Sequence, residues 1–327
     1  MNGRIQYALR DLTGGYVSTI QWKVKKGEGG VNDTLEVKGE GIKRYGWLKE
    51  QLKSRIESGE MVGCEVEAGQ GPLTLRQGDH HHYGLLEGKT YSVLEVFQRD
   101  REILVKLKNP WGKGKFTGDW CEGSVRWSQR PDIASELLPK TEPGAFWMCL
   151  DDVHSVFSTL YAVLLLEGPG SSFARCDSRL HGVEGGLNGN AQWTRETQYF
   201  IEVAATDLVG PDNNILTPEL VVSITSEDDR YQGRDYRAQS HGTRGIGVAL
   251  CHHKWPKTSA DTRKVYHLTE ESCLHVSQPF IRGRDVSFRL GIEPGQYALV
   301  VVPHSKGEAG ERYWVNAWSS APVEMTQ

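Results

Sequence analysis

The sequence predicts an α+β half followed by an antiparallel β-sandwich. Three observations support this. Helical and strand periods alternate up to about residue 165, a small-residue break follows at 167–172, and only short strand-like runs come after it. The 327 residues are enough for two domains of ordinary size. We therefore expect a first domain over residues 1–166, a linker over 167–190 and a second domain over 191–327.

The elements of the first half follow from local patterns. Apolar residues at 47, 48, 52 and 56 have helical spacing, and Gly59 is a natural helix end. Met61–Val66 is typical of a short strand. Two further strands over 91–97 and 102–107, joined by a polar turn, indicate a hairpin. A second helix is expected to begin at Asp151, with an apolar face formed by Val153, Val156, Phe157 and Leu160.

The second half repeats one kind of signal. Short apolar runs are separated by Gly, Pro, Asp or Asn, and no helical period of useful length occurs among them. Short strands at this spacing favour an antiparallel sandwich. The expected strands cover 199–205, 220–225, 245–253, 286–292, 297–303 and 313–319.

Composition excludes several classes of protein. The net charge of −4, from 38 basic and 42 acidic residues, gives no sign of nucleic-acid binding. The N-terminus has no apolar signal-peptide region, and the longest apolar run is too short to cross a bilayer. We expect an intracellular, cytoplasmic protein. The six cysteines include no Cys-x-x-Cys pair, so free thiols are expected rather than a structural zinc site.

The most informative short motif is Asn-Pro-Trp-Gly at residues 109–112. It directly follows a predicted strand, and a strand end can hold a polar group rigidly beside a cleft. The same four residues are also good turn chemistry. The motif alone therefore leaves a structural role and a functional role open.

The surrounding segments resemble the second protease-core subdomain of calpains, which are papain-like cysteine proteases. The resemblance rests on several pieces in a fixed order over about residues 5–166. They are Asp11-Leu12-Thr13-Gly14-Gly15, Gly88-Lys89-Thr90-Tyr91-Ser92-Val93, Asn109-Pro110-Trp111-Gly112, Phe116-Thr117-Gly118-Asp119-Trp120 and Phe146-Trp147-Met148.

The second half is similar to the C2-like domain that follows in calpains, known as domain III. Gly245–Ala249 resembles one of its strands, and Pro294–Pro303 resembles one of its hairpins. Together the two resemblances cover almost the whole chain. They imply a calcium-dependent cysteine endopeptidase as the family activity.

The sequence departs from the family where catalysis would occur. The resemblance implies a Gln-Gly-x-x-Gly-Asp-Cys-Trp segment with the nucleophile, and this chain contains none. At the family's histidine position stands Lys89, while Asn109, which would orient that base, is retained. An imidazole titrates near pH ~6.5 and an ordinary lysine amine near ~10.4, so lysine is a poor substitute at neutral pH. Trp111 is expected to line the same groove.

The resemblance also implies a calcium site in the loop after the Asn-Pro-Trp-Gly motif. Two carboxylate positions of that site correspond to Lys115 and Glu122. Because calcium requires several oxygen ligands, Lys115 indicates a degenerate site that binds calcium weakly if at all. No other cofactor is expected.

Two polar clusters have alternative interpretations. His80, His81 and His82 could bind a metal, but adjacent side chains of an extended chain point to opposite faces, which favours a solvated loop. Glu227, Asp228 and Asp229 resemble the acidic loop through which C2-like domains meet calcium or basic segments. A solvated turn is the alternative.

These observations favour a calpain homologue that is inactive as this chain stands, a pseudoenzyme acting as a regulatory or scaffold protein for protein partners. One alternative is a piece of an active calcium-dependent endopeptidase. Another is a module that binds partners or a membrane surface through the C2-like half, although that half has no obvious run of basic residues.

Overall fold

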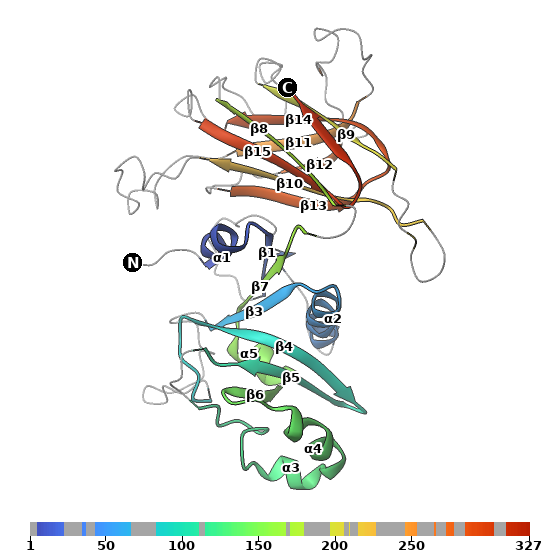
Figure 1. Ribbon diagram of the computed structural model, residues 1–327. Helices are drawn as coiled ribbons and strands as arrows, with labels where there is room; N and C mark the ends of the chain where they lie inside the picture. The colour runs from blue at the N-terminus through green and yellow to red at the C-terminus, as the bar shows by residue number, and fades with distance from the viewer. Residues whose placement is uncertain are drawn as a thin grey trace. The chain divides into compact units, whose positions relative to one another are not determined.

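The computed structural model divides the chain into two units, and each is described by itself (Figure 1). Met1–Gly29 and Thr34–Leu165 belong to the first unit, and Leu166–Gln327 forms nearly all of the second. The residues that the structure describes are 5–22, 35–36, 43–66, 83–110, 115–167, 171–179, 197–205, 209, 215–226, 246–253, 265, 273–277, 285–303 and 312–327.

One seven-stranded sheet organises the first unit, in the strand order β2-β1-β7-β3-β4-β5-β6. Every neighbouring pair is antiparallel except β1 and β2, which are parallel. The strands are β1 (Tyr16–Gln21), β2 (Leu35–Glu36), β3 (Met61–Val66), β4 (Lys89–Arg99), β5 (Glu102–Lys108), β6 (Ala145–Cys149) and β7 (Thr159–Leu164).

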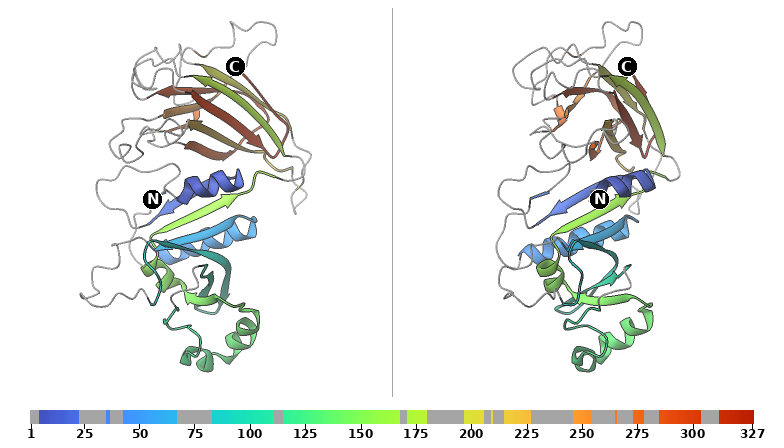
Figure 2. Two further views of the ribbon diagram at one scale, coloured as in Figure 1. Left: turned by 60° about the vertical axis from the view of Figure 1, so that its left-hand side comes forward. Right: turned by 90° about the vertical axis from the view of Figure 1, so that its left-hand side faces the viewer.

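Helices cover both faces of this sheet. Residues of α2 and α5 share one apolar core with β3, β4 and β7, and Figures 1 and 2 show α2 against the sheet near β3. A second cluster joins α3 and α4 to the other face of β5 and β6. The helices are α1 (Ile5–Thr13), α2 (Lys43–Glu57), α3 (Val125–Gln129), α4 (Pro131–Leu137) and α5 (Leu150–Val156), with a 3₁₀ turn at Leu138–Lys140.

Residues Leu104 and Val105 of β5 show how the two cores are separated. Leu104 belongs to the cluster with α3 and α4, whereas Val105 belongs to the cluster with α2 and α5. Neighbouring side chains of a strand point to opposite faces, so β5 contributes to both. Both residues are fully buried.

One predicted helix is shorter than expected. The helix beginning near Asp151 is α5, but it ends at Val156, and Leu160 lies on β7. The spacing of Val153, Val156 and Leu160 fits a helix, yet the chain changes direction after Phe157. Strand β7 lies between β1 and β3 and is buried along most of its length, so it carries a continuous apolar run that resembles a helix face.

Two antiparallel sheets form the second unit. One has the order β13-β10-β15-β8, the other β12-β11-β14-β9-β16. One core of buried side chains takes residues from both sheets, so the two pack face to face. The strands are β8 (Ser172–Arg179), β9 (Gln198–Val203), β10 (Glu219–Ser226), β11 (Ile246–His252), β12 (Cys273–Val276), β13 (Asp285–Gly291), β14 (Gly295–Pro303), β15 (Arg312–Ser319) and β16 (Val323–Thr326).

Strand β8 lies inside the segment predicted to be a linker. Residues 172–179 pair along their full length with β15, so the prediction of a linker over 167–190 missed a strand. Its inward positions hold only small residues, Ala174 and Cys176, which pack against the core. Such an edge strand gives almost no apolar signal in the sequence.

The chain as described consists mainly of antiparallel sheets with few helices. None of the helices in the described residues is long and apolar enough to cross a membrane.

Candidate functional site

Lys89 and Asn109 lie at the same end of two adjacent strands. Lys89 is the first residue of β4, and Asn109 directly follows Lys108, the last residue of β5. Ser92 pairs with Lys108. Extended by one residue, this register puts Asn109 opposite Tyr91, on the face that Tyr91 shares with Lys89. Both Lys89 and Asn109 are half-buried.

The backbone of Asn109 is fixed from the neighbouring strand. Its N–H donates to the carbonyl of Gly144 at 2.9 Å, one residue before β6 begins. Gly144 has a φ of +80°, a conformation that side chains rarely adopt. The turn at Gly144 therefore positions Asn109 through β6 as well as through β5.

The cysteine on the strand next to β4 is buried. Cys64 on β3 pairs with Tyr91 and has no exposed surface. Burial raises the pKa of the Cys64 thiol to about 12. Burial likewise raises the pKa of Cys149 to about 12. Since the thiolate is the reactive form, neither cysteine is activated for attack.

Lys115 and Glu122, the two positions expected at a degenerate calcium site, contact each other. Lys115 Nζ lies 2.8 Å from Glu122 Oε2, and both side chains are largely exposed. The hydrogen bond and the opposite charge raise the pKa of Lys115 and lower the pKa of Glu122. The ammonium group therefore sits beside the one remaining carboxylate of the pair.

Buried aromatic residues anchor the loop that carries this ion pair. Phe116 stacks on Phe146 with ring centroids 5.0 Å apart, and Trp120 packs edge-on against Trp127 at 4.8 Å. The N–H of Thr117 also donates to the carbonyl of Tyr83 at 2.8 Å. The loop is thus held at several points along its length.

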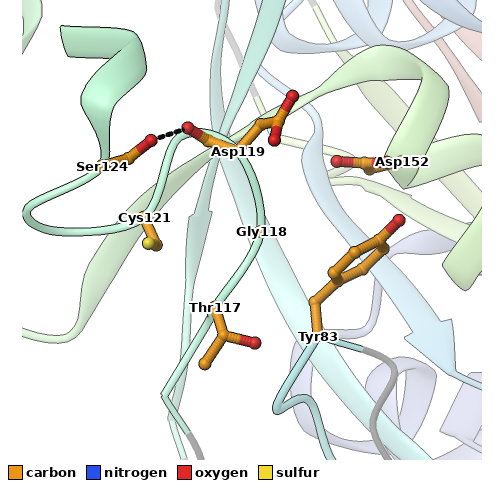
Figure 3. A pocket seen from close by; sticks show the side chains of 7 residues that line it. All are labelled: Tyr83, Thr117, Gly118, Asp119, Cys121, Ser124 and Asp152. Carbon is orange, nitrogen blue, oxygen red and sulfur yellow. Dashed lines mark hydrogen bonds between the residues drawn. The ribbon is translucent and has the colours of Figure 1, made fainter. Parts of the chain in front are cut away.

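A cavity of about 400 Å³ opens beside the same loop, and no sequence pattern predicted it. Figure 3 shows the Asp119 and Asp152 carboxylates and the Tyr83 hydroxyl directed toward one another. The Asp152 carboxylate is the largest cause that raises the pKa of Tyr83. The cavity is lined by Tyr83, Thr117, Gly118, Asp119, Cys121, Ser124 and Asp152.

The charge in this cavity is partly compensated. Arg126 donates to Asp119 Oδ2 through Nη2 at 2.9 Å and through Nε at 3.1 Å. Asp152 then remains as the carboxylate beside Tyr83. In the described part of the chain, no three His, Cys, Asp or Glu side chains are grouped to hold a metal. Residues 83, 119 and 152 are far apart in the sequence, so no local pattern could have joined them.

Other predicted site residues lie outside the described residues. These are Trp111, His80, His81, His82, Glu227, Asp228 and Asp229. The groove assigned to Trp111 and the acidic loop of the second half remain predictions.

Comparisons with known proteins agree with the family resemblance of the sequence motifs. The family model described as calpain family cysteine protease matches residues 1–163. The chain is 26% identical over 328 residues to human Calpain-14, covering 94% of this chain and 43% of that protein. It is 26% identical over 286 residues to the chicken Calpain-1 catalytic subunit, covering 79% of this chain and 38% of that protein.

A plant relative matches over nearly the whole chain. The rice calpain-type cysteine protease ADL1 is 23% identical over 332 residues, which is 99% of this chain and 14% of that protein. The chain belongs to the calpain family of cysteine proteases. It spans less than half the length of each of these three relatives.

Proposed function

We propose that this protein is a calpain homologue without proteolytic activity of its own, which acts as a regulatory or scaffold protein. Its first unit would be the second subdomain of a papain-like protease core. Its second unit would be a C2-like domain. Intracellular protein partners, rather than a peptide substrate, would be its ligands.

The observation that carries the proposal is Lys89. It begins β4 on the strand next to Asn109, at the position where the resemblance implies a histidine. A histidine acting as general base would take up and return a proton. Asn109 would orient the imidazole ring of that histidine through its second nitrogen. A lysine side chain is longer and has no second nitrogen.

The fold assignments are supported by order and topology. The family motifs lie on β4, on the segment after β5, on the loop around Trp120 and on β6, in the order of the resemblance. Two face-to-face antiparallel sheets with a shared core are the architecture of a C2-like sandwich.

We also propose that the first unit keeps its structure without a bound calcium ion. The Lys115 ammonium group neutralises Glu122 across 2.8 Å. A divalent cation would have to displace that ammonium group and would gain one carboxylate ligand fewer than the family site supplies. The loop is instead held by aromatic packing and backbone hydrogen bonds.

Assays of the purified chain test the absence of activity. We expect no cleavage of casein, with or without millimolar calcium, and no labelling by an epoxide that traps catalytic thiolates. Stoichiometric labelling of one cysteine, with cleavage lost when that cysteine is replaced, would overturn the proposal.

A chimera separates the loss of the base from the loss of the nucleophile. The subdomain of an active calpain that carries the catalytic cysteine would be fused before residue 5 in two versions. One, the Lys89 chimera, keeps Lys89, and the other carries Lys89→His. We expect the Lys89 chimera to be inactive and Lys89→His to gain measurable cleavage. Asn109→Ala in the Lys89→His chimera is the matched control and should lower that activity. Equal activity with lysine and histidine would support the endopeptidase alternative.

A further inference from the structure

Two thiols of the second unit face each other across neighbouring strands. Cys251 on β11 and Cys273 on β12 are partners in the antiparallel register, and their Sγ atoms are 3.2 Å apart. Directly facing residues of antiparallel strands have Cα atoms about 4.5 to 5.5 Å apart, within the ~4.4 to 6.8 Å that a disulfide requires. All six cysteines are free thiols in this structure.

An irregularity in β12 brings these two cysteines together. Leu250 pairs with His275, but the next residue, Cys251, pairs with Cys273, so Leu274 is an extra residue. In a regular strand Cys273 and His275 would share one face. Here Cys273 packs with the cluster on the outer face of the sheet, while the His275 ring stacks on Phe288 of the core between the sheets at 4.1 Å. The bulge therefore re-aims Cys273 toward Cys251.

The two thiols differ in accessibility. Cys251 is 1% exposed and belongs to the outer cluster, whereas Cys273 is only half-buried. Burial, together with the hydrogen bond to Cys273, raises the pKa of Cys251. An oxidant in solution would therefore reach Cys273 first.

Val265, which lies between the two cysteines in the sequence, is held against the same face of the sheet. Gln198 on β9 donates through Nε2 to the carbonyl of Val265 at 2.9 Å, and its Oε1 accepts from the N–H of Val265 at 2.8 Å. Val265 is buried in the same outer cluster as Cys251. A bond between Cys251 and Cys273 would close a covalent ring of the chain that contains Val265.

We propose that Cys251 and Cys273 are a redox modification site and form a reversible disulfide when the protein meets a small-molecule disulfide such as oxidised glutathione. Cys273 sulfur attacks that disulfide and forms a mixed disulfide, releasing one glutathione thiol. Cys251 sulfur then attacks Cys273 sulfur and expels the second glutathione thiol. Two protein thiols lose two hydrogens, and one oxidised glutathione becomes two reduced molecules. The sulfurs need to approach by about 1 Å to reach the bond length.

The bond would fasten the edge of the sheet. β12 is the terminal strand of its sheet and pairs only with β11 among the described strands. Edge strands are fixed from one side only and open more readily than central strands. The disulfide would link β12 covalently to β11 and tie the loop through Val265 to the same face.

Peptide mapping of the full chain tests the site directly. The protein would be equilibrated without oxygen in glutathione buffers from reducing to oxidising, quenched with acid and unfolded in denaturant, and all its free thiols, buried ones included, would then be trapped with a maleimide. In the oxidising buffers we expect one linked peptide pair that contains Cys251 and Cys273 and has lost two hydrogens. Cys64, Cys121, Cys149 and Cys176 should be alkylated throughout. Alkylation or separate glutathionylation of Cys251 and Cys273 in the most oxidising buffer would overturn the proposal.

Thermal unfolding gives a second measurement. We expect the oxidised chain to melt roughly 4 to 8 °C higher than the reduced chain, because the loop is closed in the unfolded state too. The difference should vanish in Cys273→Ala and persist in the matched control Cys176→Ala, which removes a thiol from an edge strand of the other sheet. A difference that persists in Cys273→Ala would assign the redox effect to other cysteines.

Discussion

The Nζ atom of Lys115 lies 2.8 Å from Oε2 of Glu122, so the two ends of one anchored loop neutralise each other. The pKa of Lys115 is raised and the pKa of Glu122 is lowered, so both groups stay charged over a wider pH range than either would alone. Both are exposed, and the pair contributes little to stability. The pair matters for ligand binding, because a cation approaching Glu122 would meet the Lys115 ammonium group at a position where the resemblance implies a carboxylate.

Calcium binding by this loop is expected to be weak, and charge reversal should strengthen it. Lys115→Glu removes the ammonium group and adds a second carboxylate, so calorimetry on the full chain should show tighter calcium binding than in the wild type. Lys115→Gln, which removes the charge without adding a ligand, should lie between the two. A micromolar site in the wild type that is unchanged by Glu122→Ala would contradict this assignment of the loop.

The ion pair between Arg55 and Glu60 is expected to matter much more for folding. Arg55 Nη1 lies 2.7 Å from Glu60 Oε2, and the two side chains are 17% and 4% exposed. Glu60→Ala would leave the guanidinium group partly buried beside Ser18, which it also contacts. We expect a loss of roughly 2 to 3 kcal/mol in the free energy of unfolding, since Arg55 keeps some contact with water.

A neighbouring exposed pair supplies the control for this prediction. Lys53 Nζ and Glu57 Oε1 lie 3.8 Å apart on α2, and the two side chains are 53% and 65% exposed. Glu57→Ala should change the free energy of unfolding by less than about 0.5 kcal/mol. Urea unfolding of both variants measures the two values. Equal losses for Glu57→Ala and Glu60→Ala would show that burial does not decide the effect.

The strands with strong patterns were predictable from the sequence. Those expected at 102–107 and 297–303 correspond to β5 (102–108) and β14 (295–303). The edge strands β8, β12 and β16 were missed because they bury few large apolar residues, whereas the edge strand β13 has a clear apolar pattern and was predicted. Leu160 was assigned to a helix because a buried central strand and a helix face can share the same apolar spacing.

Only part of the candidate site was predictable from the sequence. The family resemblance, and not a local pattern, implied that Lys89 and Asn109 lie on neighbouring strand ends, and the register of β4 and β5 puts them at the same end of the two strands. The cavity beside Tyr83 joins segments from three parts of the chain, and only packing brings Asp119 and Asp152 together. Both Lys115 and Glu122 were named from the sequence, but their direct contact follows from how the loop is anchored.

Gly84 and Gly46 should respond in opposite directions to the same substitution. Gly84 has a φ of +80°, and a Cβ atom there would lie 2.0 Å from the carbonyl oxygen of Lys115. Gly84→Ala should therefore cost about 2 kcal/mol or more in the free energy of unfolding. Gly46 lies inside α2, where a Cβ atom would meet nothing within 4 Å.

Gly46→Ala should raise the free energy of unfolding by about 0.5 to 1 kcal/mol, because alanine restricts the unfolded chain and favours the helix. Thermal and urea unfolding of the two variants test the pair together. A stable Gly84→Ala protein would show that the Lys115 loop can shift away from Gly84 without cost. In that case the loop would not be held as its contacts indicate.

The buried thiol of Cys64 should make stability fall in alkaline solution. Its pKa rises from an ordinary value of 9.0 to about 12 in the folded chain, because burial disfavours the thiolate. Below pH 9 the thiol is protonated in both states, and its full contribution to stability is present. Between pH 9 and 12 the unfolded chain releases the proton while the folded chain retains it, so each pH unit in that window lowers the free energy of unfolding by roughly 1 kcal/mol.

Cys64→Ala lacks this proton, so the difference in the free energy of unfolding between wild type and variant should narrow as pH rises through that window. Urea unfolding of both proteins at several pH values measures this difference, and parallel pH profiles would contradict the assignment of a raised pKa to Cys64.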